Sequence, residues 1–253
     1  MIQLTINPKA APFFLAGSQE TACLFIHGFT ASPSEVYPVA RQVHDLAGLT
    51  VSAPLLPGHG LTPEALNQTD WTMWFQAVQK ETESLLAHYN QVYLVGLSLG
   101  GLLALHTGYT NPGIKGIVAI NTPFYNKNPL LTRLAPVIKY LCSYFPKPVT
   151  THGIGFEKQG RFAYGVTPVK AFNSMMKLRR VVMAELSRIK APLLVMQSVQ
   201  DESVPMKSAL YIKNQTGARV VKLPSSQHVA TMGPDQELIT RSIINFIEEI
   251  QRG

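Results

Sequence analysis

The 253-residue sequence has few cysteines, no long apolar run and no internal repeat. Its only cysteines, Cys23 and Cys142, give no disulfide framework, and no Cys/His cluster has the spacing of zinc ligands. The longest apolar runs, at 21–26 and 193–196, are far shorter than the roughly 20 residues of a membrane-spanning helix. Residues 1–10 lack the basic head and apolar centre of a secretory signal. We therefore expect a cytoplasmic protein without a structural metal.

Acidic residues are scarce in one segment. Residues 123–190 hold twelve Lys or Arg against two acids, Glu157 and Glu185, whereas the whole chain has a net charge of only +7. This segment is either a solubilising face or a surface for transient contact with anionic substrates or an anionic lipid surface. No nucleic-acid recognition motif is present, so no nucleic-acid partner is expected.

Short apolar runs alternate with helical patterns along the chain. The alternation predicts an α/β fold with a mostly parallel central sheet and helices on both faces. The runs lack strict polar and apolar alternation, as is typical of strands covered on both sides. Strands are expected within the first 16 residues and at 22–26, 49–53, 92–96, 116–120, 193–197 and 220–223. Helices are expected at 33–46, 71–88, 100–109, 205–215 and 234–251.

Residues 123–187 interrupt this alternation. The segment is too long for one βα connection and is rich in Pro, Met, aromatic and basic residues. We interpret it as an inserted, mostly helical cap on a single core domain formed by 1–122 and 188–253. Within it, residues 153–165 carry four glycines and little periodicity, which predicts a loop able to move.

The strongest motif is Gly96-x-Ser98-x-Gly100, which follows a hydrophobic strand pattern and precedes an apolar helical one. A sharp strand-to-helix turn exposes the serine hydroxyl, and small residues on either side of the serine avoid clashes in the turn. The N-terminus of the following helix supplies a dipole and free N–H groups beside the hydroxyl. We predict Ser98 as a nucleophile; the alternative is a glycine-rich structural turn.

Two further polar residues follow expected strands. His228 comes after the last strand and is the only histidine beyond His152, which makes it the predicted general base. Asp201 follows the strand at 193–197 and is the predicted carboxylate that orients the histidine; the adjacent Glu202 is the alternative. The order serine, aspartate, histidine is that of the α/β hydrolases.

An earlier strand runs into His27-Gly28-Phe29. In this fold such a loop supplies one N–H of the oxyanion hole and the residue after the nucleophile supplies the other, so Phe29 and Leu99 are the predicted donors. His27 and His59 precede the nucleophile, and we interpret both as loop-forming histidines.

The motifs at 27–30, 57–60, 96–101 and 226–228 together resemble those of small bacterial carboxylesterases and monoacylglycerol lipases of the thermophilic-bacillus type. The resemblance implies the α/β-hydrolase fold and hydrolysis of carboxylic esters or monoacylglycerols of short to medium chain, without a cofactor.

The same residues leave other activities open. An acyl-thioester hydrolase or acyltransferase uses the same triad, and a non-catalytic small-molecule receptor can keep the fold. We expect a monomer or homodimer that takes a small acyl ester. Residues next to the predicted catalytic loops are expected to line the acyl site: Phe29, Leu99, Phe124, Val204 and Val229. The apolar cap residues are expected to pack the cap onto the core: Phe172, Met175, Met176 and Leu178.

Overall fold

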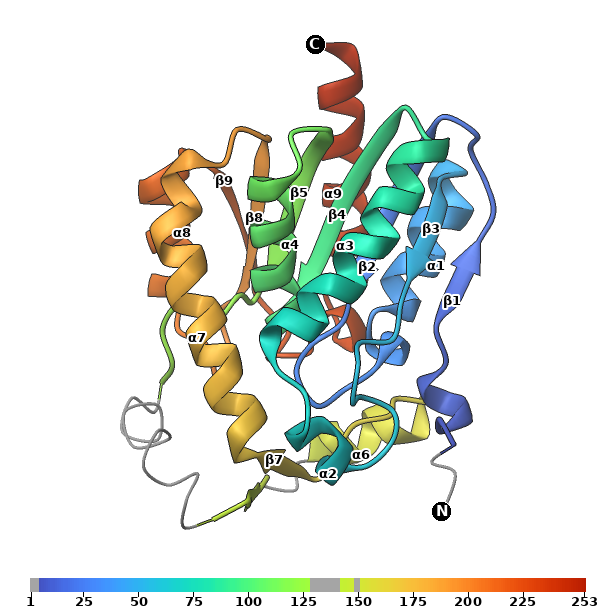
Figure 1. Cartoon of the computed structure of the whole chain (residues 1–253). Helices are drawn as coiled ribbons and strands as arrows, with labels where there is room; N and C mark the ends of the chain where they lie inside the picture. Colours follow the sequence, from blue (N-terminus) through green and yellow to red (C-terminus); the bar gives the residue numbers. More distant parts are fainter. Residues whose placement is uncertain (1–4, 128–141, 148–150) are drawn as a thin grey trace.

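The computed structural model describes residues 5–127, 142–147 and 151–253 (Figure 1). These residues form a seven-stranded sheet of order β1-β3-β2-β4-β5-β8-β9 and a separate two-stranded sheet. The strands of the large sheet are β1 (Phe13–Leu15), β2 (Thr21–Ile26), β3 (Thr50–Ala53), β4 (Gln91–Leu97), β5 (Ile114–Ile120), β8 (Leu193–Ser198) and β9 (Arg219–Leu223). Only β1 is antiparallel to its neighbour, so the sheet is mostly parallel.

The parallel strands explain the sequence pattern and place the polar loops together. Every residue of β2, β3 and β8 is buried, because helices cover both faces of a parallel sheet. The carboxyl ends of parallel strands meet at one edge. The loops that follow β2, β4, β5, β8 and β9 therefore leave the sheet on the same side.

Two layers of helices cover the sheet (Figure 1). One hydrophobic cluster joins one face of the sheet to α3 (Trp71–His88), α4 (Leu99–Thr110), α7 (Val169–Glu185) and α8 (Lys207–Thr216). A second cluster joins the other face to α1 (Tyr37–Ala47) and α9 (Gln236–Arg252). Both faces thus bury apolar side chains, which supplies the main driving force for folding.

Local signals set the helix ends. The side chain of Asp70 caps α3 by accepting hydrogen bonds from the N–H groups of Thr72 and Met73, which satisfies donors that lack partners inside the helix. At the end of α1, Gly48 adopts a left-handed conformation with φ 65°, which glycine tolerates without strain.

The expected elements agree with the structure apart from their ends. All six placed strands are present, and the strand expected within the first 16 residues is β1. The five expected helices correspond to α1, α3, α4, α8 and α9. A short helix, α2 (Pro63–Asn67), was not expected. No helix in the described residues is long and apolar enough to cross a membrane.

The described part of residues 123–187 contains the helices α6 (Thr151–Lys158) and α7 and a two-stranded antiparallel sheet of β6 (Tyr144–Pro146) and β7 (Val166–Pro168). The prediction of a loop over 153–165 is wrong for its first part, since α6 extends to Lys158 despite two glycines within it. The remainder, 159–165, is not helical. The prediction that Met175, Met176 and Leu178 pack toward the core is confirmed, because all three are buried in the cluster against α3 and α4. The rest of the expected cap, 128–141 and 148–150, lies outside the described residues.

Candidate active site

Ser98 occupies a sharp turn between β4 and α4 and has a positive φ of 56°. Such a conformation is rare for a residue other than glycine and is found at functional sites. The two flanking glycines make the turn possible. A Cβ atom on Gly96 would lie 2.1 Å from the carbonyl oxygen of Gly100, and a Cβ on Gly100 would lie 2.0 Å from that of Ile26. The backbone of this turn therefore excludes any larger residue at these positions.

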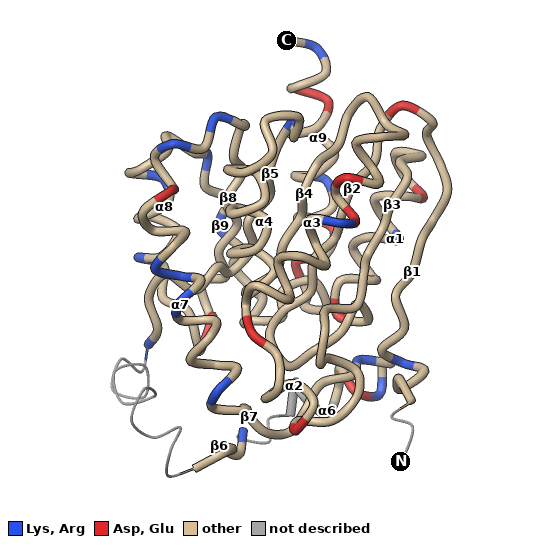
Figure 2. Tube along the Cα trace, in the orientation of Figure 1, with Lys and Arg blue, Asp and Glu red and all other residues tan. Residues whose placement is uncertain are grey.

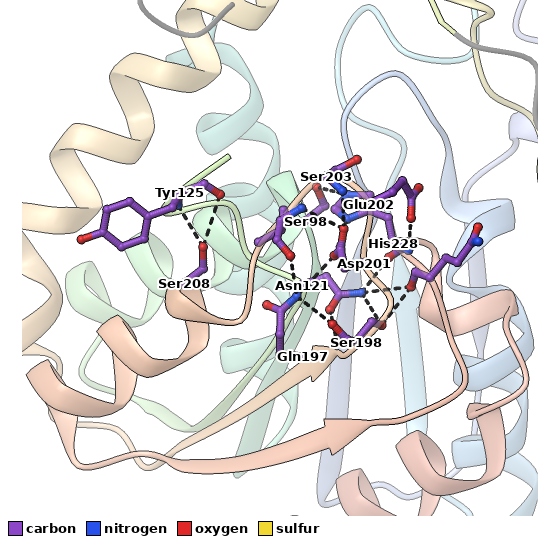
Figure 3. A network of polar contacts seen from close by, with 12 residues as sticks. Ser98, Asn121, Tyr125, Gln197, Ser198, Asp201, Glu202, Ser203, Ser208 and His228 are labelled. Atoms are coloured by element: carbon purple, nitrogen blue, oxygen red, sulfur yellow. Dashed lines mark hydrogen bonds and ion pairs between the residues drawn. The ribbon is translucent and has the colours of Figure 1, made fainter. Parts of the chain in front are cut away.

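The three residues predicted to form a triad are joined in a row (Figure 3). The Nε2 atom of His228 lies 3.0 Å from the Oγ atom of Ser98, and its Nδ1 atom lies 2.8 Å from Oδ2 of Asp201. Asp201 is almost completely buried, whereas the His228 side chain keeps 19% of its surface exposed. Loops after β4, β8 and β9 thus bring a hydroxyl, an imidazole and a carboxylate together.

The surroundings of Asp201 keep it ionised. Burial acts to raise its pKa, but His228 and the N–H groups of Val204 and Ser203 outweigh this effect, and the pKa is lowered. Both N–H groups donate to Oδ1 at 2.8 Å, which leaves Oδ2 for the imidazole. The charged carboxylate therefore accepts a hydrogen bond from Nδ1–H of His228, which leaves Nε2 as an acceptor toward Ser98.

The carboxylate of Asp201 also changes the pKa of His228. Burial acts to lower the pKa of His228, but the charge and hydrogen bond of Asp201, together with Glu202 and Glu35, raise it above its ordinary value. Glu202 is exposed and accepts a hydrogen bond from the backbone N–H of His228 at 3.2 Å. Glu202 is therefore bonded to the backbone of His228, and Asp201 is the residue that is hydrogen-bonded to the imidazole.

Asn121 is part of this network, although the sequence analysis did not single it out (Figure 3). Its Nδ2 atom donates to Oγ of Ser198 at 2.9 Å and to the carbonyl oxygen of His228 at 2.8 Å, while its Oδ1 accepts from the N–H of Ser198. Gln197 donates to Oδ2 of Asp201 at 3.3 Å. These amides fix the histidine loop and the aspartate. Their signal in the sequence is a polar residue at the end of a buried strand.

The loop after β2 lies against the nucleophile. A Cβ on Gly28 would lie 3.4 Å from Cβ of Ser98, so Gly28 lies beside the serine. In the described residues, no hydrogen bond uses the N–H of Phe29 or of Leu99. Leu99 is the first residue of α4, where N–H groups have no partner within the helix. Both predicted oxyanion donors are therefore free to bind a ligand.

The hydrogen bonds of His27 and His59 are with neighbouring loop residues, as expected for loop-forming histidines. His27 is buried, donates from Nδ1 to the carbonyl oxygen of Gly28 at 2.9 Å and accepts at Nε2 from the N–H of Leu56 at 3.1 Å. Burial lowers the pKa of His27, so the ring stays neutral. His59 is also buried and packs edge-on against His27, with ring centroids 5.0 Å apart. Neither histidine is bonded to Ser98.

This chain is similar to known proteins over most of its length. A model of the α/β hydrolase family matches residues 23–240. The chain belongs to the α/β hydrolase family. It is 30% identical over 251 residues to a thermostable monoacylglycerol lipase of Bacillus sp. (strain H-257), covering 96% of each chain. It is 29% identical to a carboxylesterase of Bacillus subtilis (strain 168), covering 97% of this chain and 98% of that one.

The solved structures agree with this assignment. A structure reported for the metagenome-derived lipolytic enzymes LipS and LipT has a TM-score of 0.88 and 29% identity, and covers 97% of this α/β hydrolase and 100% of that chain. A monoacylglycerol lipase of Paleococcus ferrophilus has a TM-score of 0.79 at 17% identity, covering 94% of this chain and 98% of that one, and supports the fold. The resemblance to small bacterial carboxylesterases and monoacylglycerol lipases is confirmed.

The residues expected to line the acyl site of this α/β hydrolase differ in accessibility. Phe29 is half-buried and packs against Phe172 of α7, with ring centroids 6.3 Å apart. Val229 is also half-buried. The other candidates, Leu99, Phe124 and Val204, are buried. No group of three His, Cys, Asp or Glu side chains in the described residues is placed to hold a metal ion.

Proposed function

We propose that this α/β hydrolase cleaves carboxylic esters through an acyl-enzyme formed on Ser98. The observation that carries the proposal is the row of hydrogen bonds from Ser98 through His228 to Asp201, with lengths of 3.0 and 2.8 Å. A serine next to a histidine whose other nitrogen is held by a carboxylate can be deprotonated as it attacks. The strained turn at Ser98 points to the same role.

The acylation half begins with attack of Ser98 Oγ on the ester carbonyl carbon, while Nε2 of His228 takes the hydroxyl proton. The carbonyl oxygen becomes an oxyanion, which accepts hydrogen bonds from the N–H groups of Phe29 and Leu99. When the tetrahedral intermediate collapses, the bond to the leaving oxygen breaks and His228 gives that oxygen its proton. An alcohol leaves, and the acyl group stays on Ser98.

The deacylation half repeats these steps with water as the nucleophile. His228 takes a proton from water as the water oxygen attacks the acyl carbon. Collapse of the second intermediate breaks the bond to Ser98 Oγ, which regains the proton from His228. A carboxylic acid leaves, and Asp201 stabilises the charged imidazole in both halves.

The substrates that we propose are acyl esters or monoacylglycerols of short to medium chain. The names of the two Bacillus relatives, which align over almost their whole length, support this class. Phe29 and Val229 are the two proposed lining residues that are not fully covered. The other three proposed lining residues are buried: Leu99, Phe124 and Val204. They would support the residues that contact the acyl group.

Replacement of Ser98 by Ala tests the proposal. The variant should lose hydrolysis of p-nitrophenyl butyrate by a factor of about 10⁴ or more, because the nucleophile is removed, and a fluorophosphonate should no longer label it. Ser84→Ala, at an exposed position of α3, is the matched control and should behave like the wild type. Turnover that survives in Ser98→Ala would exclude an acyl-enzyme on this serine.

We also propose that the basic insertion contacts anionic lipid surfaces or substrates. Figure 2 shows Lys and Arg along α7, and exposed cations such as Lys177 and Arg180 belong to this helix. Hydrolysis of monoacylglycerol in vesicles should rise when phosphatidylglycerol is included, and Lys177→Glu with Arg180→Glu should remove this increase. Lys213→Glu, on the exposed side of α8, is the control. No increase in the wild type would mean that the charge only solubilises the protein.

Location and assembly complete the proposal. We propose a cytoplasmic enzyme that acts as a monomer or homodimer. The two free thiols, Cys23 and Cys142, support a reducing compartment. Cell fractionation tests the location, and sedimentation velocity measures the assembly state.

A further inference from the structure

A second buried carboxylate lies beside the site, outside the triad. Glu35, in the 3₁₀ turn at Pro33–Glu35 after the β2 loop, is only 2% exposed. A buried carboxylate is costly unless it is paired and hydrogen-bonded. Its Oε1 accepts the N–H of Gly28 at 2.6 Å, and its Oε2 accepts Nε and Nη2 of Arg161 at 3.2 and 3.0 Å. Its backbone carbonyl accepts the hydroxyl of Thr231 at 2.5 Å.

The partners of Glu35 come from three different segments around the site. Gly28 precedes Phe29, the proposed oxyanion donor, and lies beside Ser98. Thr231 follows His228 by three residues in the short 3₁₀ helix Ala230–Met232. Arg161 belongs to the insertion and follows α6. The carboxylate of Glu35 thus connects the oxyanion loop to the insertion, and its backbone carbonyl contacts the segment that follows His228.

The contacts of Gly28 determine the direction of the Phe29 N–H. The N–H of Gly28 is held by Glu35, and its carbonyl oxygen is held by Nδ1 of His27. The peptide bond that follows is trans, so the Phe29 N–H points away from that carbonyl within the same plane. With both polar groups of Gly28 bonded, the Phe29 N–H has little freedom to turn.

The insertion holds the same loop at further points. Thr30 has a positive φ of 66°, which is unfavourable for threonine. Its carbonyl oxygen accepts the N–H of Tyr164 at 2.9 Å, and its hydroxyl accepts a hydrogen bond from Nζ of Lys147. Oγ of Ser34 accepts the N–H of Phe162 at 2.9 Å. The strained loop is therefore kept in shape by residues more than a hundred positions away in the chain.

We propose that Glu35 and Arg161 form a positioning pair that aims the Phe29 N–H at the oxyanion. This inference rests on the proposed ester hydrolysis and adds a dependence of that reaction on the insertion. The carboxylate holds Gly28, and the Arg161 guanidinium holds the carboxylate. Neither residue is hydrogen-bonded to Ser98 or to His228, so the pair positions the oxyanion donor through the loop. The charge of Glu35 also contributes to the raised pKa of His228, and Arg161→Met, which keeps that charge, separates the two effects.

Glu35→Gln and Arg161→Met test the pair. Each should lower kcat on p-nitrophenyl butyrate by about 10- to 100-fold, less than the loss of a whole oxyanion donor, with KM within about twofold. The affinity of an alkyl trifluoromethyl ketone, whose serine adduct carries an oxyanion, should fall by the same factor as kcat/KM. The double variant should be no worse than the poorer single variant, because both act through one unit.

Controls separate positioning from loss of folded protein. Glu237→Gln and Arg241→Met break an exposed ion pair of the same types on α9 and should leave kcat unchanged. Active sites are counted by fluorophosphonate labelling, so kcat refers to folded enzyme. If Glu35→Gln does not fold, Arg161→Lys serves in its place. It keeps the charge but loses the planar fork of hydrogen bonds, and should recover part of the kcat that Arg161→Met loses.

Each outcome decides the inference. Unchanged kcat and ketone affinity in the Glu35 and Arg161 variants, while Ser98→Ala is inactive, would overturn the positioning role and leave ester hydrolysis intact. A fall confined to thermal stability would also overturn it. Full activity of Ser98→Ala would overturn the proposed hydrolysis and this inference with it.

Discussion

The two sides of the site are supported in different ways. On the histidine side, the neutral side chains of Asn121, Gln197 and Ser198 hold the loops, and all three come from strand ends of the core sheet. On the oxyanion side, the charged pair Glu35 and Arg161 is bonded to the loop after β2, and Arg161 comes from residues 123–187, the segment that we interpret as an insertion. The neutral contacts named on the histidine side therefore come from the core sheet, whereas the loop after β2 is also bonded by residues of the segment 123–187.

This difference has a physical reason. Asn121, Gln197 and Ser198 hold the histidine side through neutral hydrogen bonds, whereas the carboxylates of Asp201, Glu202 and Glu35 raise the pKa of His228. The oxyanion loop contains Thr30 in a strained conformation, and stronger, charge-assisted bonds are needed to keep it there.

Asp201→Asn should have the largest effect on the histidine side. The amide removes the charge that stabilises the imidazolium and favours the wrong tautomer, so kcat should fall on the order of 10³- to 10⁴-fold. Steady-state hydrolysis of p-nitrophenyl butyrate measures the fall. Asp45→Asn, in an exposed pair with Arg41, is the control with unchanged kcat. A loss of less than tenfold would mean that Asp201 does not orient the base.

Asn121→Ala should affect both stability and activity. It removes partners of the Ser198 N–H and of the His228 carbonyl, so the free energy of unfolding should fall by about 1 to 3 kcal/mol. A displaced histidine loop should lower kcat by about 10- to 100-fold.

Asn111→Ala is the matched control, because Asn111 makes a comparable set of hydrogen bonds to Gln79 and Thr107 at the far end of α4. It should lose stability but keep kcat within about twofold of wild type. Equal losses of kcat in the two variants would argue that the neutral network has no special role at the histidine.

The pH dependence of kcat/KM should show the effect of the nearby carboxylates on the pKa of His228. Only the neutral imidazole accepts the serine proton, so kcat/KM should fall as the pH falls through the raised pKa. The midpoint of this limb should lie above the ordinary histidine value of 6.5. Glu202→Gln keeps an acceptor for the backbone N–H but removes a charge that raises the pKa, and should move the midpoint to lower pH. A wild-type midpoint below 6.5 would mean that burial outweighs the carboxylates around His228.

The sequence was sufficient to predict the histidine side to a large extent. Ser98 directly follows the buried strand β4, and Asp201 and His228 lie in the loops after β8 and β9. These patterns are local, so all three residues could be predicted without a structure. Asn121 shows the same pattern at the end of β5, but its amide carries no catalytic signature, and its partners are 77 and 107 positions away. Its role depends on the order of strands in the sheet, which local patterns do not contain.

The oxyanion side could be predicted only in part. The glycine loop predicts Phe29 as a donor, but the bond between Arg161 and Glu35 spans 126 positions, and neither residue is part of a motif. The helix α6 was missed because glycines within it argue against a helix, and tertiary packing can override that preference. Long-range ion pairs and packing therefore account for what the sequence could not reveal.

Salt should have the smallest effect on kcat. It tests whether solvent and ions reach the pair of Glu35 and Arg161. Raising the ionic strength from 0.1 to 1 M shortens the screening length from about 10 to about 3 Å, which weakens exposed pairs far more than buried ones. The Arg161 side chain is 16% exposed and that of Glu35 only 2%, whereas the Arg219 and Glu249 side chains are about half exposed. We expect kcat on a neutral p-nitrophenyl ester to change by less than about twofold. If kcat fell several-fold in the wild type but not in Arg161→Met, water and ions would reach the Glu35 pair. Salt would then weaken the pair of Glu35 and Arg161 that holds the oxyanion loop. The two sides would differ only in which segments of the chain supply their supporting residues.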